Sequence, residues 1–155
     1  MRQIEASIHI AVPPTLIDQI WSEVDRWHAW DPDTRQACLN GPFEVGTKGR
    51  IVPSKGMGIA MLITERSAGR SFTVEGHIPL FRLHFEHTVV AADGGSEVVH
   101  RVWFSGALAF LFGPGVAKQV RQGLPKTMCS LKAYAEKRNA AIHDGEVDGA
   151  KATTV

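Results

Sequence analysis

The sequence predicts an α+β fold in which a long C-terminal helix lies on a seven-stranded antiparallel sheet. Three observations support this prediction. Apolar and polar residues alternate over residues 4–12, short β-like segments separated by turn residues fill 34–105, and apolar residues recur at helical spacing over 107–138. A period of two is typical of half-buried strands, and a spacing of three to four residues is typical of an amphipathic helix. Strands and helices grouped in this way favour a sheet with helices on one face.

Two short helices follow the first strand. Pro13-Pro14 ends that strand, and Pro14 suits the first position of a helix. Apolar residues then recur at helical spacing, at Leu16, Ile17, Ile20, Trp21 and Val24. A second helical piece is predicted over 26–30, and Asp31-Pro32 ends it.

Six further strands are predicted between the short helices and the long one. They cover residues 34–39, 47–52, 57–66, 71–78, 80–90 and 97–105. Clusters of Gly, Pro, Asn, Asp and Ser separate them, as expected for turns. The connections are too short for parallel crossovers, so consecutive strands are predicted to be antiparallel neighbours.

The long helix carries one apolar stripe, formed by Val116, Val120, Leu124, Met128, Leu131 and Tyr134. Gly123 and Pro125 together cost about 4 kcal/mol in a helix interior. Burial of six large apolar side chains contributes about 10 kcal/mol. The helix is therefore predicted to persist with a kink near Leu124. Residues 1–138 are predicted to form a single ligand-binding domain, and 139–155 a flexible tail that is at most partly helical at its start.

Composition indicates one ordinary globular domain. The chain has 155 residues, 44% of them hydrophobic, with 17 Lys and Arg against 16 Asp and Glu. This charge balance removes the usual electrostatic basis for binding nucleic acid or an anionic membrane. No signal peptide or membrane-spanning segment is recognised, so a cytoplasmic monomer or homodimer is expected. Cys38 and Cys129 form no metal or redox motif, and no cofactor is expected.

The last two strands make the most informative pair. Phe81, Leu83, Phe85 and His87 share one face of the first strand, while Val98, His100, Val102 and Phe104 share one face of the second. The two apolar faces lie on the same side of the sheet only if odd-numbered residues of the first strand pair with even-numbered residues of the second. The residue numbers of each pair then have an odd sum. A hairpin loop at Asp93-Gly94 satisfies this condition and predicts that His87 faces His100.

The histidine pair on an apolar face has more than one interpretation. Both rings can be core histidines that satisfy each other or the backbone. Alternatively, they can form a polar patch in an apolar pocket that orients a carbonyl or hydroxyl group of a ligand. A metal site is disfavoured because no carboxylate or cysteine joins them. Burial is expected to lower both pKa values and keep the pair neutral. On the opposite face, His84 and Glu86, like Glu75 and His77, are predicted to be solvated.

Three stretches of the chain resemble the polyketide cyclase/dehydrase-like, START-related (Bet v 1-like) superfamily. The first runs from Ile20-Trp21 through Val24-Asp25 to Trp27, Trp30 and Pro32. The second is Gly94-Gly95-Ser96 with Val98, His100, Val102, Phe104 and Gly106. The third comprises Leu124-Pro125, Leu131-Lys132 and Ala135-Glu136. The resemblance spans residues 3–138. It implies a helix-grip fold, in which a curved sheet surrounds the C-terminal helix and encloses a hydrophobic cavity.

Three functions are considered from the residues and the resemblance. The first is binding of a small apolar molecule, lipid-, polyketide- or aromatic-like, between sheet and helix. The second is a cyclase or dehydratase without a cofactor, in which His87 or His100 is the general base. The third is a protein-interaction module that uses the outward-facing Trp103. Ligand contacts are expected from Trp30, Met61, Phe85, His87, His100, Val102, Phe104, Leu124 and Met128.

Overall fold

The computed structural model describes the backbone of residues 3–151 and the side chains of residues 3–146. Strand β1 (Ile4–Ile10) is followed by helix α1 (Pro14–Ser22) and the 3₁₀ helix η1 (Val24–Ala29). Six strands come next: β2 (Thr34–Leu39), β3 (Lys48–Pro53), β4 (Ile59–Ser67), β5 (Ser71–Ile78), β6 (Phe81–Ala92) and β7 (Gly95–Ser105). Helix α2 (Ala109–Lys151) ends the described chain. This element order confirms the predicted α+β fold class.

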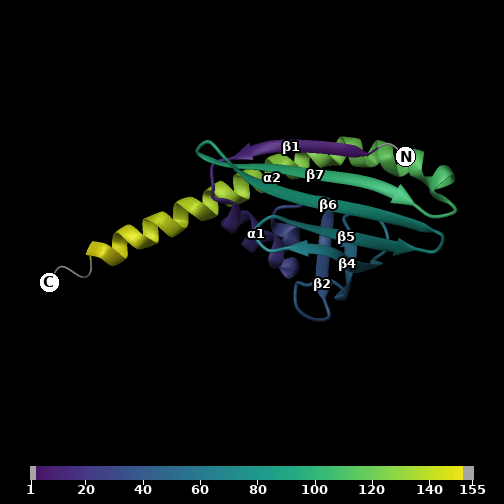
Figure 1. The fold of residues 1–155 in the computed structure, drawn as a ribbon, viewed down its shortest axis with the longest axis horizontal. Helices are drawn as coiled ribbons and strands as arrows, with labels where there is room; N and C mark the ends of the chain where they lie inside the picture. Colours follow the sequence, from purple (N-terminus) through teal and green to yellow (C-terminus); the bar gives the residue numbers. More distant parts are fainter. Residues whose placement is uncertain (1–2, 152–155) are drawn as a thin grey trace.

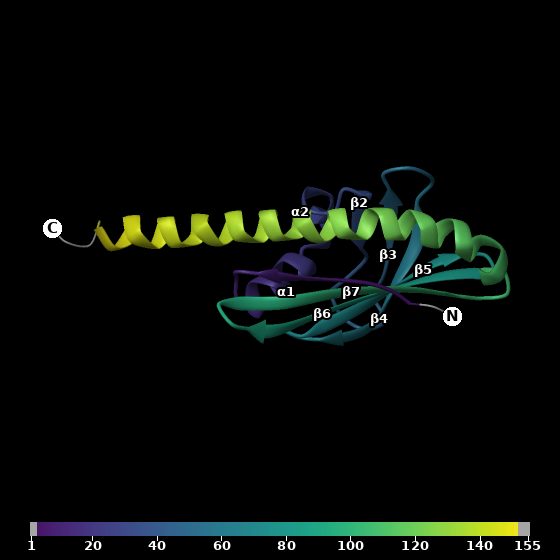
Figure 2. The same cartoon turned by 90° about the horizontal axis from the view of Figure 1, so that it is seen from above.

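The seven strands form one antiparallel sheet in the order β1-β7-β6-β5-β4-β3-β2. The sheet curls so strongly that β2 and β3 run across the direction of β6 and β7 (Figure 1). Two irregularities in register contribute to this curvature, one between Thr34 and Gln36 and one between Ile63 and Glu65. Helix α2 lies over the curled sheet, as Figure 2 shows from above.

The β6–β7 hairpin has the register that the alternation predicted. Residue pairs Leu83–Phe104, Phe85–Val102 and His87–His100 lie opposite each other across the two strands. The loop between Ala92 and Gly95 contains two residues, and Gly94 there has a φ of 73°, which a residue with a side chain rarely adopts. Turn chemistry and hydrophobic pattern therefore specify the same pairing.

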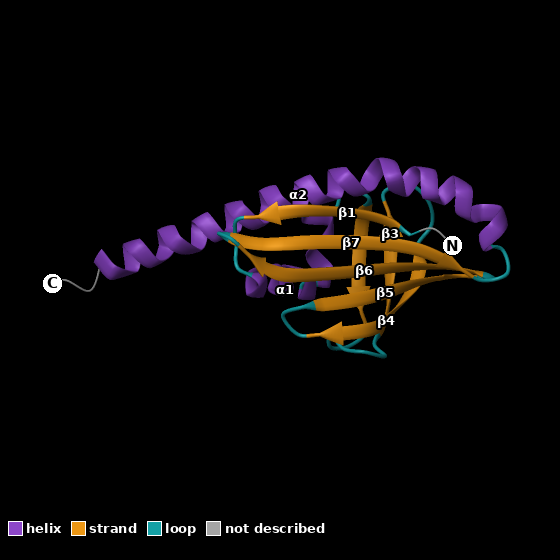
Figure 3. Cartoon of the chain, turned by 45° about the horizontal axis from the view of Figure 1, so that its top comes forward, coloured by secondary structure: helices purple, strands orange, loops and turns teal. Residues whose placement is uncertain are grey.

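Helix α2 begins at Ala109, within the predicted stretch 107–138, and extends beyond the C-terminal end of that stretch. It includes the Gly113-Pro114-Gly115 segment, because Ala109 and Ala117 on either side are buried against β6 and β7 and their packing offsets the poor helix propensity. It is bent rather than straight (Figure 3). Beyond Arg138 it continues to Lys151, where the composition predicted a flexible tail. Residues 152–155 of that predicted tail lie outside the described residues.

The middle of α2 is attached to the start of the chain by polar contacts. Arg138 donates two hydrogen bonds to the Glu23 carboxylate, with N–O distances of 2.6 and 2.8 Å. This hydrogen bonding lowers the pKa of Glu23 and raises that of Arg138. The Ala11 N–H donates to Glu136 at 3.1 Å. Beyond these contacts the helix projects past the sheet (Figure 1). The contacts therefore lie at the end of the part of α2 that packs on the sheet.

Two hydrophobic clusters fill the space between helix and sheet. The larger cluster joins the helical tryptophans to the sheet and to α2; its members include Trp21, Trp27, Trp30, Phe72, Met128 and Leu131. The smaller cluster lies toward the start of α2 and includes Phe81, Leu83, Val102, Phe104 and Leu124. Each large side chain buried in these clusters contributes about 1.5–3 kcal/mol to stability.

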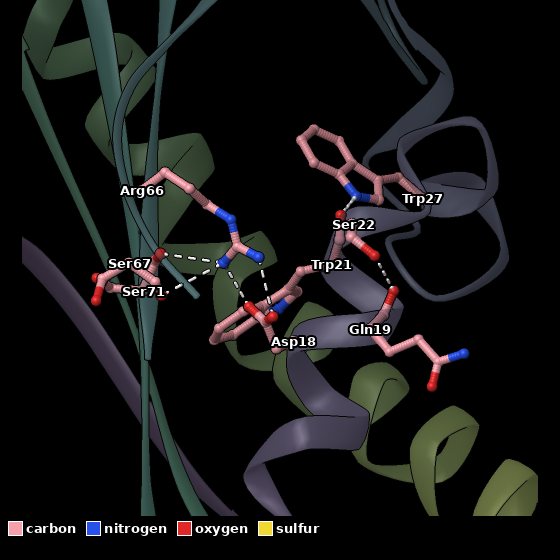
Figure 4. Close-up of polar contacts among 8 residues, drawn as sticks. All are labelled: Asp18, Gln19, Trp21, Ser22, Trp27, Arg66, Ser67 and Ser71. Atoms are coloured by element: carbon pink, nitrogen blue, oxygen red, sulfur yellow. Dashed lines mark hydrogen bonds and ion pairs between the residues drawn. The ribbon is translucent and has the colours of Figure 1, made fainter. Parts of the chain in front are cut away.

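A half-buried ion pair holds α1 against the sheet. The Arg66 guanidinium on β4 donates to both carboxylate oxygens of Asp18 on α1, at 2.5 and 2.9 Å (Figure 4). Beside it, the Trp27 indole N–H donates to the Trp21 carbonyl at 2.8 Å and fixes η1 relative to α1. These contacts help to orient η1, whose Trp27 belongs both to the larger cluster and to the lining of the cavity described below.

We predict that Asp18→Asn lowers the free energy of unfolding by about 1–3 kcal/mol, because it removes a charged acceptor from a half-buried two-point contact. Glu5→Gln is the matched control. Glu5 also accepts from an arginine, Arg101, but its side chain is 51% exposed, so a loss of less than about 1 kcal/mol is expected. Urea unfolding of both variants measures the difference, and equal losses would show that the Asp18 pair has no special role.

Candidate ligand cavity

A cavity of about 360 Å³ lies between α2 and the inner face of the sheet. Its lining takes residues from both hydrophobic clusters, so it occupies the gap between them. Val116, Gln119 and Val120 of α2 form one wall, and the opposite wall comes from β5 and β6. Lys55, Gly56 and Met57 of the β3–β4 loop line it as well, and the side chain of Met57 is 86% exposed. The cavity is within the size range of small-molecule sites.

Three of the residues predicted to contact a ligand line this cavity: Trp30, Phe85 and His87. The other six lie in the packed interior instead: Met61, His100, Val102, Phe104, Leu124 and Met128. Strand alternation and the apolar stripe of α2 identified the buried faces correctly, because all six residues are buried. These patterns carried no information about where along each strand the packing between helix and sheet is incomplete.

The histidine pair lies at the edge of the cavity, where His100 is buried and His87 is partly exposed. The rings of His87 and His100 are 4.3 Å apart between centroids and nearly perpendicular. His87 stacks on Phe72 at 4.0 Å with an interplanar angle of 4°. Trp21 packs against both histidines, at 5.8 and 6.0 Å. Only His87 reaches the cavity lining, and His100 lies behind it against Trp30.

Burial determines the protonation of the pair. Loss of hydration lowers the pKa of His87 to about 3, although the backbone carbonyls of Phe72 and Phe85 act in the opposite direction. Burial also lowers the pKa of His100 well below its ordinary value, and the neighbouring His87 lowers it further. Both imidazoles are therefore neutral at pH 7, and each has one nitrogen that donates and one that accepts.

Several buried polar atoms around the pair have no hydrogen-bond partner among the described residues. They include Trp30 Nε1, His87 Nδ1 and His100 Nε2. A buried polar group without a partner is uncommon in native proteins and calls for an explanation. Trp30 and His87 both line the cavity, so these two covered nitrogens lie directly behind its wall, where a small side-chain movement would bring them to a ligand.

Asp31 adds a polar side to the cavity that the sequence reasoning missed. Its carboxylate accepts from the Thr34 hydroxyl at 2.6 Å, the Asp33 N–H at 3.0 Å and the Thr127 hydroxyl of α2 at 3.1 Å. Burial raises its pKa, and these hydrogen bonds only partly offset that effect. In the sequence, Asp31-Pro32 indicated only a helix end. The Thr127 contact, 96 residues away, has no local signal.

The described residues contain no group of three or more His, Cys, Asp or Glu side chains arranged to hold a metal ion. Among these residues, no helix is long and apolar enough to cross a membrane.

Comparisons with solved structures identify the fold. The chain is similar to the crystal structure of Ara h 8.0201 at 15% identity, with a TM-score of 0.67 over 86% of this chain and 97% of that one. It is similar to TTHA0849 from Thermus thermophilus at 13% identity, with a TM-score of 0.70 over 86% of this chain and 97% of that one. Identity at this level shows a shared fold alone, here the helix-grip fold of Bet v 1-like proteins.

A third similar structure is the di-domain ARO/CYC StfQ from the steffimycin biosynthetic pathway, at 12% identity and a TM-score of 0.70. The match covers 89% of this chain and 51% of that chain. In sequence, no curated protein matches. A profile of the family described as polyketide cyclase / dehydrase and lipid transport matches residues 1–136. The chain therefore belongs to the polyketide cyclase/dehydrase and lipid transport family.

Proposed function

We propose that the protein binds a small, largely apolar molecule that carries a carbonyl or hydroxyl group. The observation that carries this proposal is the 360 Å³ cavity, whose lining includes Trp30 and His87, two residues that each carry a buried nitrogen without a partner among the described residues. A buried donor or acceptor left unsatisfied costs about 1–3 kcal/mol. A ligand that supplies the missing partner removes that cost, so the polar group of the ligand is expected to lie against these two residues.

The rest of the lining defines the class of ligand. Ile59, Val74, Leu83, Phe85 and Val120 provide apolar walls, which favour a lipid-, polyketide- or aromatic-like molecule of compact size. Membership in a family described as polyketide cyclase / dehydrase and lipid transport supports this class, and so does the fold shared with an ARO/CYC protein. No cofactor or metal is part of the proposal.

Binding is favoured over cyclase or dehydratase catalysis at this cavity. A general base is most effective when its pKa is near the working pH. Burial lowers the pKa of His87 to about 3, which makes it a weak base. His100 does not line the cavity. The cytoplasmic location, the monomeric or homodimeric state and the domain boundary at residue 138 stay predictions.

We predict that Val120→Trp weakens binding of the neutral fluorescent probe N-phenyl-1-naphthylamine at least tenfold, because the larger side chain fills the cavity from α2. The matched control is Val90→Trp, at a residue that is 57% exposed and outside the cavity lining. Fluorescence titration measures both dissociation constants. An unchanged affinity in a folded Val120→Trp variant would place probe binding elsewhere and contradict the proposal.

We predict that Trp30→Phe weakens binding of 2-acetonaphthone by about fivefold to tenfold, the usual contribution of one hydrogen bond. The aromatic ring is kept and only the indole N–H is lost, so binding of the hydrocarbon 2-ethylnaphthalene should change much less. Competition against the fluorescent probe compares the two ligands. Equal losses for ketone and hydrocarbon would indicate a packing role for Trp30 instead of polar recognition.

We predict that the histidine pair makes the protein less stable in acid. An unfolded histidine, with a pKa near 6.5, accepts a proton that folded His87, with a pKa of about 3, does not. The free energy of unfolding is therefore constant above about pH 7 and decreases as the pH falls toward 3, by about 2 kcal/mol at pH 5 for His87 alone.

Urea unfolding at pH 7 and pH 5 measures this dependence. His87→Phe combined with His100→Phe should remove most of it, since phenylalanine does not titrate and fits among aromatic neighbours. His143→Gln, at an exposed position on α2, is the control and should leave the pH dependence unchanged. A double variant as acid-sensitive as the original protein would show that other groups cause the loss.

A further inference from the structure

The outer face of the sheet carries a polar cluster that includes three residues predicted to be solvated, Glu75, His77 and His84. It consists of Glu75 and His77 on β5, Arg82 and His84 on β6, and Ser105 at the end of β7. Glu75 is only 9% exposed, because its neighbours cover it. The antiparallel register places Glu75 opposite His84 and His77 opposite Arg82. The alternation identified the face correctly, but not that long polar side chains on adjacent strands bury one another.

Within this cluster, His84 connects a serine to a carboxylate. His84 Nε2 lies 2.7 Å from Ser105 Oγ, a hydrogen-bond distance. His84 Nδ1, on the other side of the ring, lies 3.5 Å from Glu75 Oε2. Trp103 stacks on the imidazole with centroids 5.1 Å apart and an interplanar angle of 3°. The ring is therefore held in the plane that directs one nitrogen to each partner.

The chemistry of the two partners assigns the protons. An ionised carboxylate only accepts hydrogen bonds, so the ring nitrogen facing Glu75 carries the hydrogen and Nε2 is free to accept from the Ser105 hydroxyl. Partial burial lowers the pKa of His84, although Glu75 acts in the opposite direction, so the ring is neutral at pH 7. A neutral imidazole that accepts from a serine hydroxyl, with its other nitrogen facing a carboxylate, is the arrangement that activates serine nucleophiles.

A second cavity, of about 580 Å³, lies beside this serine. Its lining includes Ser105, Gly106, Ala107, Leu80 and Arg82. Gly106 has a φ of 104°, and a Cβ on it would lie 2.5 Å from the Leu80 carbonyl oxygen, so only glycine allows this tight turn. The backbone N–H groups of Gly106 and Ala107 donate to no acceptor among the described residues. They are available to an oxyanion formed next to Ser105.

We propose that Ser105, His84 and Glu75 form a nucleophilic site that hydrolyses small esters bound in this second cavity. Ser105 Oγ attacks the ester carbonyl carbon while its proton passes to His84 Nε2. The tetrahedral intermediate breaks its C–O bond to the leaving alcohol, which takes that proton. Water then attacks the acyl-serine and gives a proton to His84, and the acid leaves as the proton returns to Ser105. Ester and water become acid and alcohol, with no other reactant.

The reactive side chains of this site are separate from those of the ligand cavity, although Ile78 lines both cavities. The three side chains lie on the outer face, whereas His87 and His100 lie on the inner face of the same hairpin. Failure of either proposal therefore leaves the other unaffected.

The test measures hydrolysis of p-nitrophenyl acetate and covalent labelling by an alkyl fluorophosphonate. The full chain should hydrolyse the ester above the rate in buffer and take up one phosphonyl group on Ser105, located by peptide mass spectrometry. Ser105→Ala should abolish labelling and lower the rate at least tenfold. His143→Gln, at an exposed position on α2 outside both cavities, should leave both readouts unchanged.

His9→Gln is the matched control for His84→Gln. His9 is an exposed histidine of β1 whose Nε2 lies 3.0 Å from the Asp93 carbonyl oxygen, and it does not line the second cavity. We expect His84→Gln to lower the rate at least tenfold and His9→Gln to change it less than about threefold. Circular dichroism confirms that each variant is folded. Absence of labelling in the original chain, labelling at another residue, or equal rates for Ser105→Ala and the original chain would overturn the proposal.

Discussion

The register of the β6–β7 hairpin is the constraint on which both sites depend. The two-residue loop at Asp93-Gly94 pairs residues whose numbers total 187, as in His87 with His100. Side chains alternate between faces, so a slip of one residue in one strand would move its entire set of side chains to the other face. This one register determines both the pairing of the inner histidines and the pairing of His84 with Trp103 on the outer face. This register is strongly favoured in free energy, because a shifted register would expose the apolar inner face to water.

The same alternation explains how much of the fold could be predicted. Strands, short helices and hairpin register follow from local periodicity and turn residues, which the sequence displays directly. The extent of α2 does not. Gly113-Pro114-Gly115 and Pro125 have poor helix propensity, yet packing of Ala109, Ala117 and Leu124 keeps the helix continuous. In this helix, burial of side chains against the sheet outweighs the poor helix propensity of these residues. A local sequence pattern reports propensity but not tertiary burial.

The candidate sites were predictable in part, for a related reason. Trp30, Phe85 and His87 were identified because they lie on an apolar face or beside it. Whether a buried residue lines a cavity or fills the core depends on how α2 crosses the curled sheet, which no local pattern specifies. Asp31 was missed because its partner on α2 is distant in sequence. Glu75 was placed on the correct face but with the wrong burial, because covering it requires side chains from two strands.

Burial divides the histidines of this hairpin between two kinds of chemistry. Desolvation lowers the pKa of His87 to about 3, so its charged form is strongly disfavoured, which leaves a hydrogen-bonding group that orients a ligand but gains a proton poorly. His84 is half-buried beside a carboxylate, so protonation is less costly there and a proton can pass through the ring. The two histidines are three residues apart on one strand, and the sheet separates them. The proposed binding site on the inner face and the proposed ester-hydrolysing site on the outer face therefore both use histidine. The two environments favour different roles for it.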